Sequence, residues 1–93
     1  MAEYLVELYV AQGNPVAAQQ QADRAERASA DLTREGRPVR CVRSIFVPED
    51  ETCFFLYEAE SADAVREATR LAGLSSVRIT EALGARKEEK ACL

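Results

Sequence analysis

The chain has 93 residues, which corresponds to one small domain. Its 12 basic and 16 acidic residues give a formal net charge of −4, which argues against a general binder of nucleic acids or anionic membranes. It contains no histidine, so the commonest metal ligand and the usual acid-base group near neutral pH are missing, and every catalytic triad that needs an imidazole is excluded.

The packing volume available for a core is limited, because 16 of the apolar residues are alanine. A chain of this size is only marginally stable alone and gains from oligomerisation. No apolar run reaches the roughly 18 residues of a membrane span, and the first residues do not have the pattern of a secretory signal. The three cysteines lack the spacing of a zinc site. We therefore expect a reduced, cytoplasmic protein.

The first half of the chain predicts a strand followed by a long helix. Apolar residues alternate over residues 4–10, which is typical of a strand. Asn14 is a favourable N-cap and Pro15 suits the first helical position. Residues 16–35 are rich in Ala, Gln, Arg and Glu, which are strong helix formers. Gly36 then ends the helix with a left-handed cap.

The second half predicts two strands, a helix and a last strand. Residues 39–47 and 53–58 form a strand pair around a polar hairpin loop. Ser61 caps the second helix, which stops at Gly73. Residues 77–83 form the fourth strand.

The resulting order, β-α-β-β-α-β, is that of the α+β ferredoxin-like fold. This fold has a four-stranded antiparallel sheet with both helices on one face. We expect residues 1–84 to form this single domain and residues 85–93 to form a charged, flexible tail. The other face of the sheet must then meet water, a ligand or another subunit.

The register of the central hairpin decides what that other face contains. If the loop over residues 48–52 closes symmetrically, Arg43 lies opposite Tyr57, and Ile45 and Phe55 share their face. Both faces of the strand pair are then apolar, which is not expected for a sheet with one face in water. We therefore expect a homodimer that forms through the face without helices.

Several polar side chains are expected on the same face. We assign the fully apolar side of the first strand to the helices. The candidate ligand-binding residues are then Glu7, Tyr9, Arg43, Tyr57, Arg78 and Thr80. An apolar floor with a few polar groups is the composition of a small-molecule pocket. In the alternative interpretation, these residues form the polar rim and ion pairs of a dimer interface.

The chemistry of this cluster favours an anionic or enolic ligand. Glu7 and Arg43 form a possible charge-assisted pair, and Tyr57 can donate its phenolic proton. We predict no catalytic residue, no metal ligand and no cofactor.

Residues 39–74, VRCVRSIFVPEDETCFFLYEAESADAVREATRLAGL, carry a family resemblance. Together with the initial EYLVELYV and the final VRIT, this stretch resembles a bacterial family of small proteins with a domain of unknown function, often labelled nickel-binding. The resemblance implies a ferredoxin-like subunit and homodimers whose sheets face each other. We do not expect the nickel association to transfer, because such sites would use histidine near the second strand. Arg43 stands where that histidine would be sought, and its positive charge repels a metal ion.

Three classes of function remain open from the sequence. The interpretation that we favour is a non-catalytic homodimer with a small-molecule site between two sheets. The second is a nickel or other metal-binding protein, as the family label implies, although the available ligands suit nickel poorly. The third is a cofactor-independent enzyme of the dimeric α/β-barrel type, which rests on analogy of fold. Without histidine, its chemistry would depend on Glu7, Tyr57 and Arg43. In each case the expected partners exclude nucleic acids and membranes.

Overall fold

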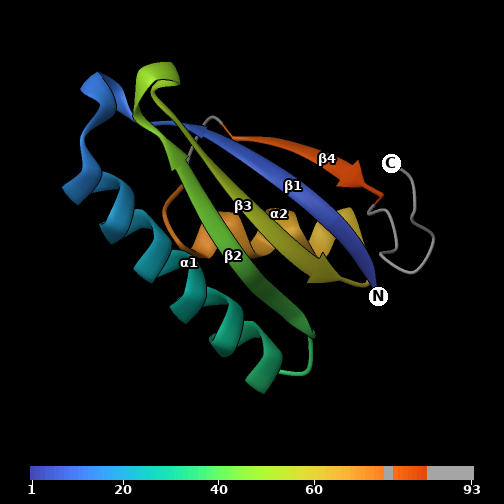
Figure 1. Ribbon diagram of the computed structural model, residues 1–93. Helices are drawn as coiled ribbons and strands as arrows, with labels where there is room; N and C mark the ends of the chain where they lie inside the picture. The colour runs from blue at the N-terminus through green and yellow to red at the C-terminus, as the bar shows by residue number, and fades with distance from the viewer. Residues whose placement is uncertain (75–76, 84–93) are drawn as a thin grey trace.

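The computed structural model describes residues 1–74 and 77–83. The elements follow the predicted order (Figure 1): β1 (Ala2–Tyr9), α1 (Pro15–Arg34), β2 (Val39–Val47), β3 (Thr52–Ala59), α2 (Ala62–Leu71) and β4 (Arg78–Ala82), with short 3-10 turns η1 (Ala11–Gly13) and η2 (Pro48–Asp50). The sheet order is β2-β3-β1-β4, and every neighbouring pair is antiparallel. The predicted α+β class with four antiparallel strands and two helices is confirmed. The order is compatible with the ferredoxin-like arrangement. The predicted tail, residues 85–93, lies outside the described residues.

Both helices begin at the caps that the sequence predicts. The Asn14 Oδ1 atom accepts hydrogen bonds from the backbone N–H groups of Val16 and Ala17, at 2.9 and 3.3 Å. The Ser61 hydroxyl accepts a hydrogen bond from the N–H of Ala64 at 3.3 Å. These bonds satisfy N–H groups that have no partner within their helix.

Neither helix in the described part of the chain has the length and apolar composition of a membrane span.

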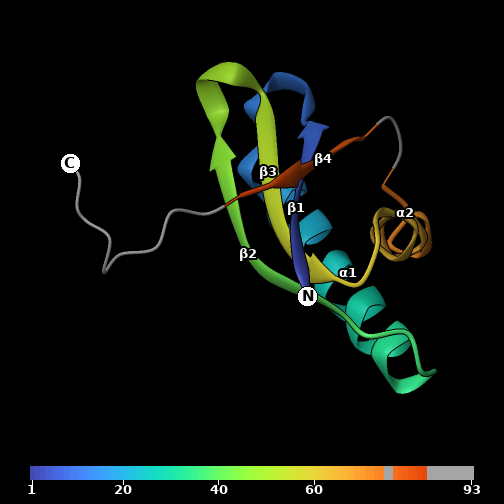
Figure 2. The same ribbon diagram turned by 90° about the vertical axis from the view of Figure 1, so that its right-hand side faces the viewer.

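The molecule has two layers, with α1 and α2 on the same side of the sheet (Figure 2). The apolar side chains of residues 4–10 that the sequence assigned to the helix side are buried as expected: Tyr4, Val6 and Leu8 of β1, and Val10 directly after it. Phe55 and Tyr57 on β3 complete this core and are fully buried. No described element covers the opposite side of the sheet, which we call the open face.

The predicted hairpin register is wrong. Glu51 takes a left-handed backbone conformation with φ of 51°, and its N–H donates to the carbonyl of Pro48, so the turn ends one residue earlier than expected. Thr52 already belongs to β3 and lies opposite Val47. A second irregularity, between Cys41 and Arg43, shifts the register again.

The corrected register exchanges the two faces of β3. Phe54 and Leu56 lie on the open face, whereas Phe55 and Tyr57 point towards the helices. The prediction that Phe55 lies on the open face is therefore wrong. The physical reason is the period of two in a strand, because a slip of one residue moves every side chain to the other face.

Candidate ligand site on the open face

The open face is a grid of side chains, because residues directly opposite each other on neighbouring strands share a face. Two rows cross all four strands in the order β4, β1, β3, β2: Arg78, Glu7, Phe54, Ile45 and then Thr80, Leu5, Leu56, Arg43. The centre of the face is thus apolar, with Leu5, Phe54 and Leu56 side by side. Polar side chains border this centre on β4 and β2, as the composition of a ligand site requires.

The two ends of the face differ in charge. At one end, Glu3 lies opposite Glu58, and Arg40 on β2 contacts Glu58 through an ion pair of 3.1 Å between Nη2 and Oε1. At the other end, Tyr9 lies opposite Thr52, and the side chain of Tyr9 is 62% exposed. The face therefore presents both acidic and basic groups around its apolar centre.

The structure brings most of the predicted site residues to this face. The residues that lie there as predicted are Glu7, Tyr9, Arg43, Arg78 and Thr80. Whether they bind a ligand stays a prediction. Sequence reasoning missed Phe54 and Leu56, the apolar floor of the site. Because the hairpin register was predicted wrongly by one residue, the alternation along β3 assigned Phe55 and Tyr57 to the open face in place of Phe54 and Leu56.

Tyr57 is the exception, and its predicted place beside Arg43 is wrong. It lies opposite Cys41 and its side chain is 0% exposed, beneath the helices. Burial raises the pKa of the Tyr57 phenol well above its usual value, and the nearby Cys41 adds to this effect. The phenol is therefore protonated at neutral pH and cannot reach a ligand on the open face.

The expected Glu7–Arg43 pair is replaced by another. Glu7 lies opposite Arg78, and their Oε2 and Nη1 atoms are 3.7 Å apart. Arg43 is on the outer strand β2, with β3 between it and Glu7. Arg43 forms no ion pair with another described residue. Its guanidinium is therefore the charged group of this face that is available to an anion.

The two described cysteines lie on the helix side of the sheet and are free thiols. Burial raises the pKa of Cys41 to about 11, and the charge of Glu26 adds to this shift. The pKa of Cys53 is also raised by burial. Because the thiolate is the nucleophile and the metal ligand, these shifts lower the reactivity of both thiols at neutral pH.

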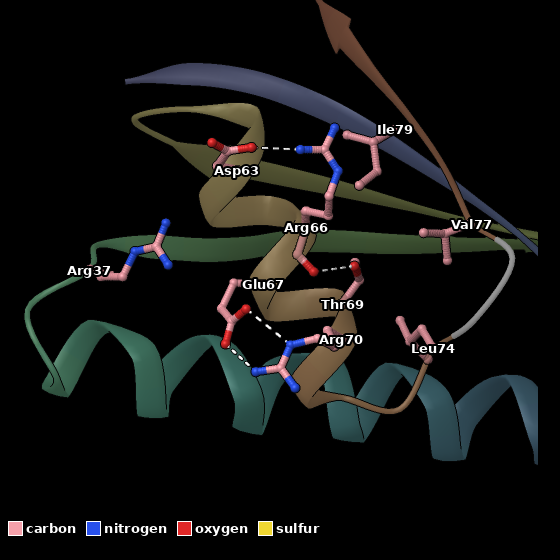
Figure 3. A pocket seen from close by; sticks show the side chains of 9 residues that line it. All are labelled: Arg37, Asp63, Arg66, Glu67, Thr69, Arg70, Leu74, Val77 and Ile79. Atoms are coloured by element: carbon pink, nitrogen blue, oxygen red, sulfur yellow. Dashed lines mark hydrogen bonds and ion pairs between the residues drawn. The ribbon is translucent and has the colours of Figure 1, made fainter.

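A separate groove of about 680 Å³ lies between α2 and β4 (Figure 3). Two of its arginines are paired along the helix, because Arg66 contacts Asp63 at 2.6 Å and Arg70 donates to Glu67. Arg37, which also lines the groove, forms no ion pair with another described residue. The hydrogen bond from Arg70 lowers the pKa of Glu67. Its three arginines outnumber the two carboxylates of Asp63 and Glu67, so the lining carries one positive charge in excess.

Comparison with known proteins gives one match. A family model described as "Nickel responsive protein SCO4226-like" matches residues 4–82, which is most of the chain. The family resemblance that the sequence indicated is confirmed. The searches of curated proteins and of solved structures give no match.

The side chains of this chain do not fit the nickel ion in that description. Nickel sites in proteins use imidazole, carboxylate and thiolate ligands, and the chain has no histidine. Over residues 1–74 and 77–83, no group of three or more Cys, Asp or Glu side chains could hold a metal ion. On the open face, Glu7 is paired with Arg78, and Arg43 adds positive charge.

Proposed function

The chain belongs to the SCO4226-like family, and we propose that it acts as a non-catalytic homodimeric module that binds a small organic anion between two open faces. One observation carries this proposal. The open face has an apolar centre with no cover from a described element, and an arginine without an ion-pair partner lies at its edge.

The dimer is inferred from the apolar surface of the open face. Ile45, which lies opposite Phe54 on this face, is 49% exposed. Apolar patches of this kind mark interaction sites, because leaving them in water costs free energy. A second copy is the favoured occupant since the face carries both signs of charge, with Glu3 at one end and Arg43 and Arg78 at its sides. Two copies of such a face can match opposite charges in an isologous contact.

The ligand class follows from the charged groups. Glu7 is neutralised by Arg78 and does not repel an anion strongly. Arg43 can bind a carboxylate or an enolate through charge-assisted hydrogen bonds, and the Thr80 hydroxyl is a further polar group on the face. Exclusion of water by a second sheet would strengthen these bonds.

The proposal is non-catalytic because the phenol that the sequence placed beside Arg43 as a proton donor does not lie on the open face. The enzyme interpretation relied on Tyr57 as that donor, and Tyr57 is buried beneath the helices. The remaining phenol of the face, Tyr9, is largely exposed.

Native mass spectrometry of the gently purified protein tests the proposal. We expect the mass of two chains together with a co-purified acidic molecule that is released when the dimer is denatured. Light scattering over a range of concentrations provides an independent measure of the oligomeric state. A single-chain mass at every concentration would refute the dimer and, with it, the enclosed site.

A further inference from the structure

A second groove lies on the helix side of the sheet, between α1 and the outer edge of β2. Its volume is about 570 Å³, and its walls include Ala30 and Thr33 of α1 with Pro38, Val39 and Cys41 of the following segment. Carbon atoms form most of the surface of this groove. The groove lies on the far side of the sheet from the open-face site, so it is independent of the proposed function.

The geometry of Thr33 argues against a peptide strand as the occupant. Its Oγ1 atom accepts a hydrogen bond from the N–H of Val39 at 3.2 Å and donates one to the Val39 carbonyl at 2.9 Å. The two backbone groups that an added strand would need at this residue are therefore already satisfied. The groove is better suited to a small molecule.

Two buried hydroxyl groups lie at this groove or next to it without a proper partner. Ser29 lines the groove and is 4% exposed, and Tyr57 is 0% exposed. Their oxygens lie close enough for Ser29 to affect the pKa of Tyr57, but neither forms a hydrogen bond of normal geometry with a described group. Even if one hydroxyl donates to the other, the second hydrogen still has no acceptor. A buried donor without an acceptor is costly and favours a ligand that supplies one.

The charges around the groove favour neither an anion nor a cation. Glu26 lines it and forms no ion pair with another described residue. The arginines at its rim are already paired: Arg34 with Asp31 and Arg40 with Glu58. Met1 also lines the groove, and its positive α-amino group offsets the carboxylate of Glu26, so the lining carries no excess charge of either sign.

We propose that this groove binds a small, neutral, largely apolar molecule with one oxygen acceptor, as in an alcohol or a phenol, which accepts a hydrogen bond from the Ser29–Tyr57 pair. The hydroxyl of Ser29 is covered although Ser29 lines the groove. Rotation of this short side chain about its Cα–Cβ bond is the smallest movement that exposes the oxygen. The ligand then satisfies the donor that the folded chain leaves unpaired.

Three probes of similar shape test the proposal on the full chain by amide chemical shifts in nuclear magnetic resonance. We expect 4-methylphenol to give saturable shifts at Ser29, Val39 and Cys41. Toluene, which lacks the acceptor, should bind at least about tenfold more weakly, equivalent to about 1.4 kcal/mol. The anion 4-methylbenzoate should give no saturable shift. If 4-methylphenol gives none, or if its preference over toluene is less than tenfold, the proposal is overturned.

Variants locate the site. Ala30→Phe fills the groove from α1 and should abolish binding of 4-methylphenol. Gln20→Phe, at an exposed α1 position that lines no groove described above, is the matched control and should leave binding unchanged. Ser29→Ala should reduce the preference over toluene, whereas Ile45→Asp on the open face should have no effect. Unchanged binding in Ala30→Phe would overturn the assignment of the site.

Discussion

Arg43 lies opposite Leu56, whereas Tyr57 lies opposite Cys41. The register from Arg43 to Val47 is set by the turn, which pairs Val47 with Thr52, and it places Arg43 and Tyr57 on opposite faces of the sheet. Arg43 is available to a ligand or a second copy on the open face, while Tyr57 completes the core. A site that requires both residues does not form. Arg43 does share the open face with Glu7, Arg78 and Thr80.

Ile45→Asp should weaken the proposed dimer. The exposed side chain of Ile45 lies beside Phe54, near the apolar centre of the open face. A carboxylate buried there without a partner costs several kcal/mol. We therefore expect the dissociation constant to rise at least about 100-fold, or about 2.8 kcal/mol, as measured by analytical ultracentrifugation.

The control for this variant is Val16→Asp. Val16 is an equally apolar exposed residue in the first turn of α1, away from the open face. An acidic residue is favourable near a helix N-terminus, so the fold should be unaffected. If both variants associate as the wild type does, the open face is not the interface.

Arg43→Ala should abolish binding of the co-purified acid and leave the dimer folded. Arg43 has no ion pair with a described residue, so its removal leaves no buried charge alone. Arg78→Ala should behave differently, because it leaves Glu7 without its partner and should lower dimer stability. Native mass spectrometry measures the first effect and urea denaturation the second. Arg27→Ala, at an exposed position of α1, is the control and should retain the acid. Retention of the acid in Arg43→Ala together with its loss in Arg27→Ala would contradict the assigned site.

The element order and the orientation of β1 could be predicted from the sequence. Asn14 and Ser61 are strong caps, and the alternation along β1 has one fully apolar side, so only one orientation buries Val6. For β3 the sequence is ambiguous, because Phe54 and Phe55 are both apolar and alternation does not distinguish the faces.

Two local features therefore determined the β3 register, and neither has a clear signature. Glu51 takes a left-handed conformation that usually indicates glycine or asparagine. The irregularity near Val42 adds a residue within β2 without a glycine or proline to announce it. The prediction for Tyr57 failed because of the turn, which displaces β3 by one residue relative to Arg43, whereas those for Arg78 and Thr80 depended only on β1 and β4.

Nickel should bind weakly or not at all. Titration calorimetry of a tag-free chain with nickel chloride should show no stoichiometric site tighter than about 1 μM, or about −8 kcal/mol. The same chain with a hexahistidine tag is the positive control, because the tag supplies the imidazoles that the sequence lacks. A submicromolar stoichiometric site in the tag-free chain would contradict the misfit described above.

The stability of the protein should fall at alkaline pH. Burial raises the pKa of Cys41 from 9.0 to about 11. Since the folded chain holds this proton more tightly than the unfolded chain, the contribution is complete below about pH 9 and is lost as the pH rises towards 11. Tyr57 and Cys53 have raised pKa values and act in the same direction. Urea denaturation between pH 8 and 11 should show a smaller decline in Cys41→Ala than in the wild type. Identical slopes would contradict the buried thiol.

Gly13→Ala should destabilise the fold more than Gly73→Ala. Both glycines have positive φ, 59° and 76°, so either substitution costs about 1–2 kcal/mol of backbone strain. At Gly13 an added Cβ would also lie 2.8 Å from the carbonyl oxygen of Pro48, whereas at Gly73 nothing lies within 4 Å. The oxygen belongs to the backbone of η2, so the hairpin turn itself must shift. Urea denaturation should give an additional loss of about 1–3 kcal/mol for Gly13→Ala, the cost of overpacking. Equal losses in the two variants would contradict the close contact between η1 and η2.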